Sequence, residues 1–160
     1  MSVAALFPHA VRSSREAIAI AIGFLAIVGA AHSARAADAP TASLTVTFTG
    51  IKTQAGSIMV SLAGDKAAYS GKSADAGHAA VAAKGAVVTA VFTGLTPGSY
   101  AIRAFHDLNG NGALDANPFG IPTEPYAFSN NARGAMGPPG WDAAVFTVKA
   151  GDNTQTIVID

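Results

Sequence analysis

The feature that most constrains the fold is an alternation of apolar and polar residues from Ser43 onward. Leu44, Val46 and Phe48 share one face of an extended segment, and the threonine after each of them lies on the other face. The same period of two recurs around residues 58–62 and 100–104, and denser apolar runs follow elsewhere. A period of two is typical of half-buried β-strands. The pattern predicts an all-β fold, an antiparallel β-sandwich of about seven strands with one long ordered loop.

One turn narrows this prediction. Over residues 95–100, Leu95 faces the core, Pro97 and Gly98 set a turn, and Tyr100 begins the next strand. The segment resembles the turn before a strand in fibronectin type III, Cna B-type and transthyretin-like sandwiches. The resemblance implies an Ig-like or transthyretin-like sandwich in which the Tyr100 hydroxyl bonds the backbone upstream of it. We therefore expect a structural role for this tyrosine.

The N-terminus has the pattern of a secretory signal peptide over residues 1–36. Two arginines precede an apolar run at residues 17–31, and a small-x-small cleavage site follows at residues 34–36. The run is shorter than the roughly 20 residues that a membrane-spanning helix needs, which makes an uncleaved N-terminal anchor the less favoured alternative. We expect an exported protein, periplasmic or extracellular, with no stable membrane span after cleavage and a single β-sandwich domain over residues 37–160.

Charge and cysteine content exclude several classes of protein. Of the 10 basic and 10 acidic residues, residues 1–36 hold 3 and 1, so the remainder has a net charge of −2 before histidine is counted. Nucleic-acid binders usually carry a strong excess of basic residues, so no nucleic-acid partner is expected. The chain contains no cysteine, which excludes disulfides, cysteine nucleophiles and thiolate metal sites.

Two segments fall outside the alternation. The alanine-rich residues 65–84 are compatible with either a helical turn or a short edge strand. Residues 107–142 are rich in glycine, proline and asparagine, and long loops of this kind are usually functional or disordered. They nevertheless carry large apolar side chains at Phe119, Ile121, Tyr126, Phe128, Met136 and Trp141. So many apolar groups argue against disorder, and we expect this connection to pack over one end of the sandwich and carry the functional site.

The start of that connection has the spacing of a calcium loop. Oxygen-bearing side chains alternate, Gly112 permits a sharp turn, and a backbone carbonyl and a second aspartate follow. The candidate ligands are Asp107, Asn109, Asn111, Ala113 and Asp115. This is the first half of an EF-hand-type loop, which binds calcium through oxygen atoms. Pro118 stands where that loop has a bidentate glutamate, and Glu124 could replace it only if the chain folds back. The alternative is a set of Asn-Gly turns capped by Asp107.

His106 offers a second kind of metal site. With His78 or Met136 it could form an exported transition-metal or small-molecule carrier. If the alternation of the strand continues, however, His106 faces the same side as Tyr100. The alternation therefore favours a hydrogen-bonded histidine at the rim of the sandwich.

Aromatic and amide side chains mix at residues 126–134. The candidates for contact with a saccharide or a peptide are Tyr126, Asn130, Asn131 and Arg133. Rings stack on sugars, amides bond hydroxyls and a guanidinium pairs with carboxylates. The alternative is that these side chains anchor the loop. Ser129, His106 and Asp142 could form a catalytic triad, but no nucleophile elbow surrounds the serine. We expect no enzymatic activity, and a hydrolase is the least favoured class.

The segment from Tyr100 to Pro139 resembles the bacterial family named domain of unknown function 2141. The shared motifs lie at residues 100–115, 120–122, 126–131 and 137–139. By implication the protein is an exported bacterial β-sandwich whose role is uncharacterised. The 107–115 loop is also similar to the calcium loops of SdrD B-type repeats in surface adhesins, which usually continue to a glutamate.

These features predict a non-enzymatic binding or interaction module whose long loop is ordered by a calcium-type ion or by its own hydrogen bonds. Calcium is the only cofactor expected. The expected partner is an envelope protein or a glycan. The carrier built on His106 is the alternative.

Overall fold

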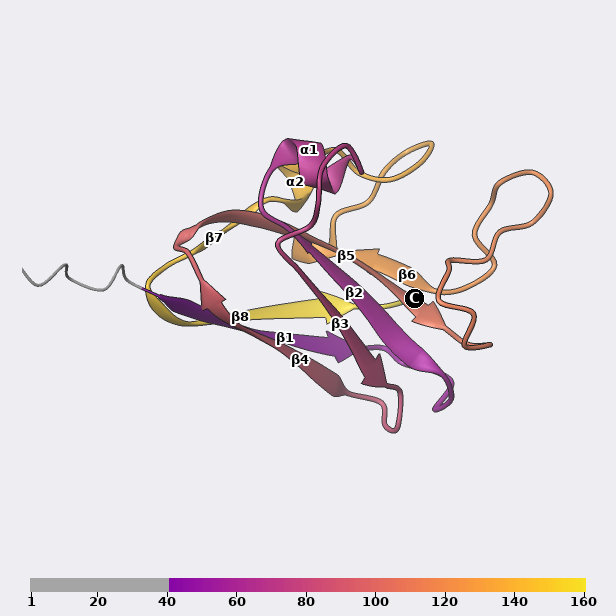
Figure 1. Cartoon of the computed structure of the whole chain (residues 1–160). Helices are drawn as coiled ribbons and strands as arrows, with labels where there is room; N and C mark the ends of the chain where they lie inside the picture. The colour runs from indigo at the N-terminus through magenta and orange to yellow at the C-terminus, as the bar shows by residue number, and fades with distance from the viewer. Residues whose placement is uncertain (1–40) are drawn as a thin grey trace, which may run out of the picture. The chain divides into compact units, whose positions relative to one another are not determined.

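The computed structural model describes residues 41–160, so the predicted signal peptide lies outside the described residues. Figure 1 shows the arrangement of the secondary structure. The strands are β1 (Ala42–Thr49), β2 (Ser57–Ala63), β3 (Gly77–Ala82), β4 (Val88–Leu95), β5 (Gly98–Asp107), β6 (Tyr126–Phe128), β7 (Phe146–Val148) and β8 (Gly151–Val158). The helices are α1 (Lys66–Tyr69), the 3-10 helix η1 (Ser129–Asn131) and α2 (Trp141–Ala144). No helix in the described part of the chain is long and apolar enough to cross a membrane.

The strands form two sheets. The three-stranded sheet has the order β4-β1-β8, and the five-stranded sheet has the order β3-β2-β5-β6, with β7 also paired to β5. Among the described strands, β1 and β8 alone run parallel, in register from Ala42 with Gly151 to Thr49 with Val158. The predicted sandwich is confirmed, with this one parallel pair in an otherwise antiparallel arrangement.

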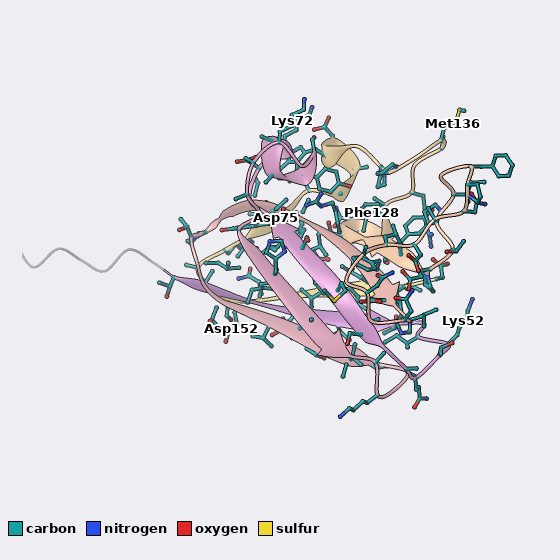
Figure 2. All side chains as sticks on the ribbon, turned by 45° about the vertical axis from the view of Figure 1, so that its right-hand side comes forward. Lys52, Lys72, Asp75, Phe128, Met136 and Asp152 are labelled. Atoms are coloured by element: carbon teal, nitrogen blue, oxygen red, sulfur yellow. The ribbon has the colours of Figure 1, made fainter. Side chains whose placement is uncertain are left out.

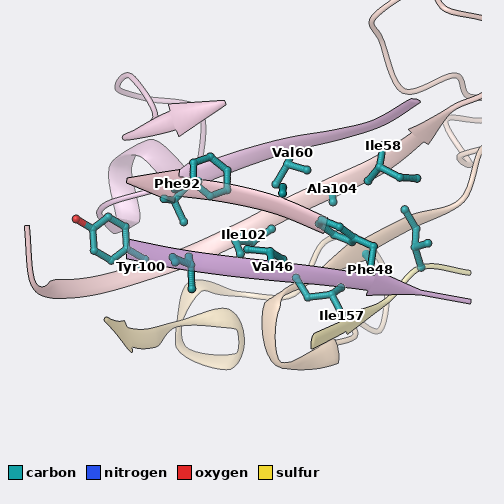
Figure 3. Packing of buried hydrophobic residues seen from close by; sticks show 14 of the residues in the cluster. Val46, Phe48, Ile58, Val60, Phe92, Tyr100, Ile102, Ala104 and Ile157 are labelled. Atoms are coloured by element: carbon teal, nitrogen blue, oxygen red, sulfur yellow. The ribbon is translucent and has the colours of Figure 1, made fainter. Parts of the chain in front are cut away.

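The core lies between the sheets because the apolar face of each alternating strand turns inward. Leu44, Val46 and Phe48 of β1 have no exposed surface, and Ile58 and Ile102 of the opposite sheet are equally buried. Figure 3 shows the labelled members of this core, among them Val46, Phe48, Ile58 and Ile102, packed together. Burying one side chain of this size stabilises the fold by about 1.5–3 kcal/mol, so this inner face holds the two sheets together.

The predicted tyrosine corner is confirmed. The Tyr100 hydroxyl donates a hydrogen bond of 2.7 Å to the carbonyl of Thr96, four residues upstream. The ring itself is buried in the core between the sheets. The tyrosine thus fixes the turn between β4 and β5 from inside the molecule.

Residues 65–84 contain both of the structures that their sequence allowed. Asp65 caps α1 by accepting a hydrogen bond of 2.8 Å from the backbone N–H of Ala68. A few residues later the chain enters β3, which pairs with β2 at the edge of the five-stranded sheet. This placement puts α1 on the outer side of that sheet, beside α2 (Figure 1).

Part of the long connection packs against the sandwich and part does not. β6 joins the edge of the sheet, and Phe128 enters a second apolar cluster formed with Tyr69 and Ala144. Phe119 is 88% exposed and Met136 is fully exposed, at the outer end of its loop in Figure 2. The prediction that the connection packs down therefore fails at its loop tips, because the turn at residues 117–121 closes on its own hydrogen bonds.

A serine fills a gap in the edge pairing of β5. β6 pairs with residues 103–105 of that strand and β7 pairs with residues 98–100, which leaves Ile102 between them. The Ile102 N–H donates to Ser129 Oγ (2.9 Å), and that hydroxyl donates to the carbonyl of Ala144 (2.6 Å). A fully buried hydroxyl therefore takes the place of a strand partner.

Candidate functional site

The 107–115 loop begins at the end of β5 and closes on the carboxylate of Asp107, which is 3% exposed. Its Oδ1 accepts hydrogen bonds from the N–H groups of Gly110 (2.7 Å) and Asn111 (3.2 Å), and its Oδ2 accepts one from Gly112 (2.9 Å). Gly112 has a φ of 77°, which gives the sharp turn predicted for it. A carboxylate can accept about four hydrogen bonds, so the loop fills most of this capacity and leaves room for one further contact.

The other polar side chains of the loop meet at Asp115. Asn109 Nδ2 donates to its Oδ2 (2.6 Å), and Asn111 Nδ2 donates to its Oδ1 (3.0 Å). Each asparagine Oδ1 accepts a bond from the backbone two residues later, at Asn111 and Ala113. The structure therefore brings the predicted ligands into one loop, with amide nitrogens turned toward the second carboxylate.

Glu124 folds back onto this loop. This return is the condition under which Glu124 could replace the missing glutamate of an EF-hand-type loop. The return is made by a bridge between Ala116 and Pro122. Glu124 is 6% exposed, and its Oε1 accepts from the N–H of Leu108 (2.8 Å) while its Oε2 accepts from the N–H of Asp115 (3.0 Å). This carboxylate ties the two ends of the loop together through the backbone.

The side chains of the loop do not form a metal site from acidic groups alone. In residues 41–160, no three histidine or acidic side chains lie close enough together to hold a metal ion. A cation here would depend on amide and backbone oxygens beside Asp107 and Asp115. Oxygen ligands of this mixed kind suit a hard cation such as calcium.

The residues of the alternative carrier are separated. His106 is 1% exposed, and its Nε2 lies 2.7 Å from the carbonyl oxygen of Ala55, as a structural histidine at the rim would. His78 lies on β3, where its Nδ1 is 3.2 Å from Ser61 Oγ. Met136 stands at the outer end of an exposed loop.

Three of the four predicted contact residues bond backbone groups or the side chain of Asp160. Asn130 Nδ2 donates to the carbonyls of Ala143 (3.2 Å) and Val145 (2.9 Å). Asn131 Oδ1 accepts from the N–H of Val158 (2.8 Å), and Arg133 pairs with Asp160. Both asparagines have positive φ values, a conformation that asparagine tolerates better than most residues. These contacts anchor the connection to α2 and β8.

The fourth, Tyr126, lines a cavity of about 620 Å³ that the sequence did not predict. The cavity lies on the outer face of the five-stranded sheet, bounded by α1, α2 and residues of the long connection. Its aromatic wall is a chain of edge-to-face contacts: Tyr126 with Phe128 (ring centroids 6.0 Å apart), Phe128 with Tyr69 (6.3 Å) and Tyr69 with Trp141 (5.8 Å).

Two basic side chains, Arg103 and Lys66, line the same cavity. Arg103 Nη2 donates to both oxygens of Asp75 (2.9 and 2.8 Å), and the guanidinium lies 6.0 Å from the centre of the Tyr69 ring. Burial raises the pKa of Tyr69, and the charge of Arg103 opposes that rise. The Tyr69 hydroxyl donates to the carbonyl of Pro139 (3.0 Å).

One signal in the sequence points to this cavity. Outward positions of a half-buried strand are usually polar, yet Phe105, Tyr126 and Phe128 occupy such positions on β5 and β6. Aromatic residues on the expected polar face indicate that something covers it. The sequence did not show that the cover is formed by α1 and α2.

Comparison with known proteins identifies the family. A family model described as an uncharacterised protein conserved in bacteria, DUF2141, matches residues 46–156, which is more than half of the chain. No curated protein and no solved structure matched the chain. The match spans both sheets, the 107–115 loop and the cavity. The chain therefore belongs to the bacterial DUF2141 family, as its motifs at residues 100–139 predicted.

Proposed function

We propose that this protein is an exported, non-catalytic binding module in which a calcium-type ion orders the 107–115 loop. The observation that supports the ion most is the convergence of two amide groups on Asp115, where Asn109 and Asn111 donate to its two oxygens. Partial positive charge is already directed at this carboxylate. A cation placed there would satisfy the same electrostatic requirement more strongly.

A small rearrangement would complete the site. A half turn of each amide presents Oδ1 in place of Nδ2 toward Asp115, at the cost of the hydrogen bond that each Oδ1 accepts from the backbone, and Asp107 has capacity for one further contact. With the carbonyl of Ala113 these groups supply about five oxygen atoms, and water would supply the rest of the six to eight that calcium takes. Few of these ligands are charged, so we expect a dissociation constant on the order of 10⁻⁴–10⁻³ M, as in extracellular modules.

The side chains that a hydrolase would use are committed to structural contacts, which supports a non-catalytic role. Ser129 is fully buried, and its hydroxyl both accepts and donates a hydrogen bond to the backbone. His106 is buried and contacts the carbonyl of Ala55. A nucleophile and base need a shared open site and a common hydrogen bond, which these two contacts do not provide.

Export supports the choice of ion and partner. The pattern of residues 1–36 directs the chain to the periplasm or the cell exterior, and weak calcium sites are typical of extracellular modules. An ordered loop would present the exposed side chains of Leu108 and Leu114 as a fixed surface. The partner of such a surface is an envelope protein or a glycan.

Calcium titration with thermal unfolding tests the proposal. At 100 times its dissociation constant, a ligand of the native state adds about 2.7 kcal/mol of stability, which raises the Tm by several degrees for a domain of this size. Asp115→Asn should lower the calcium affinity at least about tenfold, because it removes one of two charged ligands. Asp115 is a better choice than Asp107, whose carboxylate also holds three backbone N–H groups.

Asp152→Asn is the matched control, because this exposed carboxylate on β8 accepts a hydrogen bond from Ser43 and lies outside the loop. It should leave the calcium response unchanged. Equal calcium responses in wild type, Asp115→Asn and the control would refute the ion site. The loop would then be held by its own hydrogen bonds.

A further inference from the structure

We propose that the cavity on the outer face of the five-stranded sheet binds an amphipathic organic anion. A ring or short hydrocarbon body packs against the aromatic wall, and the oxyanion accepts hydrogen bonds from Arg103 and Lys66. The inference rests on three features of the cavity: its apolar lining, the sign of its charge and the guanidinium donors that Asp75 does not use.

The lining fits an apolar body. Tyr69, Tyr126, Phe128 and Trp141 form one continuous wall through their edge-to-face contacts, and Met59 and Phe105 extend it across the sheet. Aromatic faces offer large contact area at low conformational cost. Ligand cavities commonly measure about 300–1,000 Å³ and combine a mainly apolar lining with a few polar groups. At about 620 Å³ this cavity has that size and that lining.

The charge of the cavity selects an anion. Arg103 and Lys66 line it, and no acidic residue does. Asp75 pairs with Arg103 from outside the lining and uses Nη2 alone. Aromatic cages that bind quaternary ammonium ions use the same rings, but two basic side chains would repel such a cation.

The guanidinium of Arg103 marks where the oxyanion would lie. Asp75 uses Nη2 alone, so the Nη1 protons are left for an acceptor in the cavity, whereas Nε is enclosed by protein atoms. A carboxylate or similar group is the acceptor that best matches a guanidinium. Lys66, exposed on α1, provides a second cation at the opening.

Fluorescence of Trp141 provides a direct test, because it is the single tryptophan of the chain and lines the cavity. The purified protein is titrated with phenylacetate and with octanoate, which represent ring and hydrocarbon bodies. Phenylacetamide and octanamide are the neutral counterparts. For ligands of this size we expect dissociation constants on the order of 10⁻⁴–10⁻³ M, with at least one anion binding about tenfold more tightly than its amide.

Two variants locate the anion. Arg103→Lys keeps a cation beside Asp75 but removes the guanidinium donors that Asp75 does not use, so it should abolish most of the tenfold preference for the anion. Lys66→Gln should reduce that preference by about half or more, since it removes the cation at the opening. Lys52→Gln is the matched control because Lys52 is exposed and does not line the cavity. Circular dichroism confirms that each variant is folded.

The proposal is overturned if neither anion changes the Trp141 emission at millimolar concentration. It is also overturned if the amides bind as tightly as the anions, a result that needs no variant and stands even if Arg103→Lys fails to fold. Calcium is left out of the titration, because Leu114 of the 107–115 loop also lines the cavity. Both proposed donors lie outside that loop, on β5 and α1, so the anion titration can succeed or fail whatever the calcium experiment shows.

Discussion

Replacing Ser129 by alanine should destabilise the fold far more than the loss of one small polar group suggests. The Ser129 hydroxyl accepts from the Ile102 N–H (2.9 Å) and donates to the Ala144 carbonyl (2.6 Å), and the residue has no exposed surface. Alanine leaves both backbone groups buried and unpaired. Each such group costs about 1–3 kcal/mol, so we expect a loss of about 3 kcal/mol in the free energy of unfolding.

Chemical unfolding in urea measures this loss, and a parallel thermal scan should show a Tm lower by about 10 °C for a domain of this size. Ser70→Ala is the matched control: its hydroxyl makes one exposed hydrogen bond, to the carbonyl of Lys66. It should change stability by less than about 0.5 kcal/mol. A loss below about 1 kcal/mol for Ser129→Ala would refute the view that this hydroxyl completes the edge pairing of β5.

Two further predictions concern Tyr69 and Gly56. Burial raises the pKa of Tyr69 above its ordinary value of 10.0, and Arg103 opposes that rise, so the folded state keeps the phenol proton to higher pH than the unfolded state. The resulting stability is intact below about pH 10 and falls as pH rises through the folded pKa. In denaturant unfolding, the free energy of unfolding of Tyr69→Phe should therefore fall less steeply at alkaline pH than that of the wild type. An equally steep fall in both proteins would contradict this. Gly56 has a φ of 68°, and an added Cβ would lie 2.0 Å from the carbonyl oxygen of Asp107. Gly56→Ala should therefore cost at least about 2 kcal/mol more than Gly71→Ala, which has a φ of 71° but no atom within 4 Å of its Cβ; equal losses in urea unfolding would show that the close approach is relieved.

Much of the sandwich could be predicted because its determinants are local. The alternation at Leu44, Val46 and Phe48 identifies the inner face of β1, since successive side chains of a strand point to opposite sides. The tyrosine corner is equally local, because the Tyr100 hydroxyl reaches a carbonyl only four residues away. The contacts of Asn109 and Asn111 with Asp115 are local as well, because they span at most six residues.

The long-range contacts could not be predicted in the same way. Glu124 returns to the 107–115 loop only because the chain reverses at residues 116–122, and its carboxylate then bonds the backbone of that loop. The parallel pairing of β1 with β8 joins segments more than a hundred residues apart, as Ala42 with Gly151 shows. Local periodicity carries no information on which strand becomes the neighbour of another.

The alternation of apolar and polar residues establishes which side chains share a face of each strand, and hence that two apolar faces meet as a sandwich. What covers the outer face of the five-stranded sheet depends on contacts between distant segments. Tyr69 and Trp141 reach it from α1 and α2, which lie over seventy residues apart in the chain. A period of two gives the side of the sheet that each side chain faces, but not the segment that packs against that side. The cavity lined by Arg103 therefore forms only when those helices are in place.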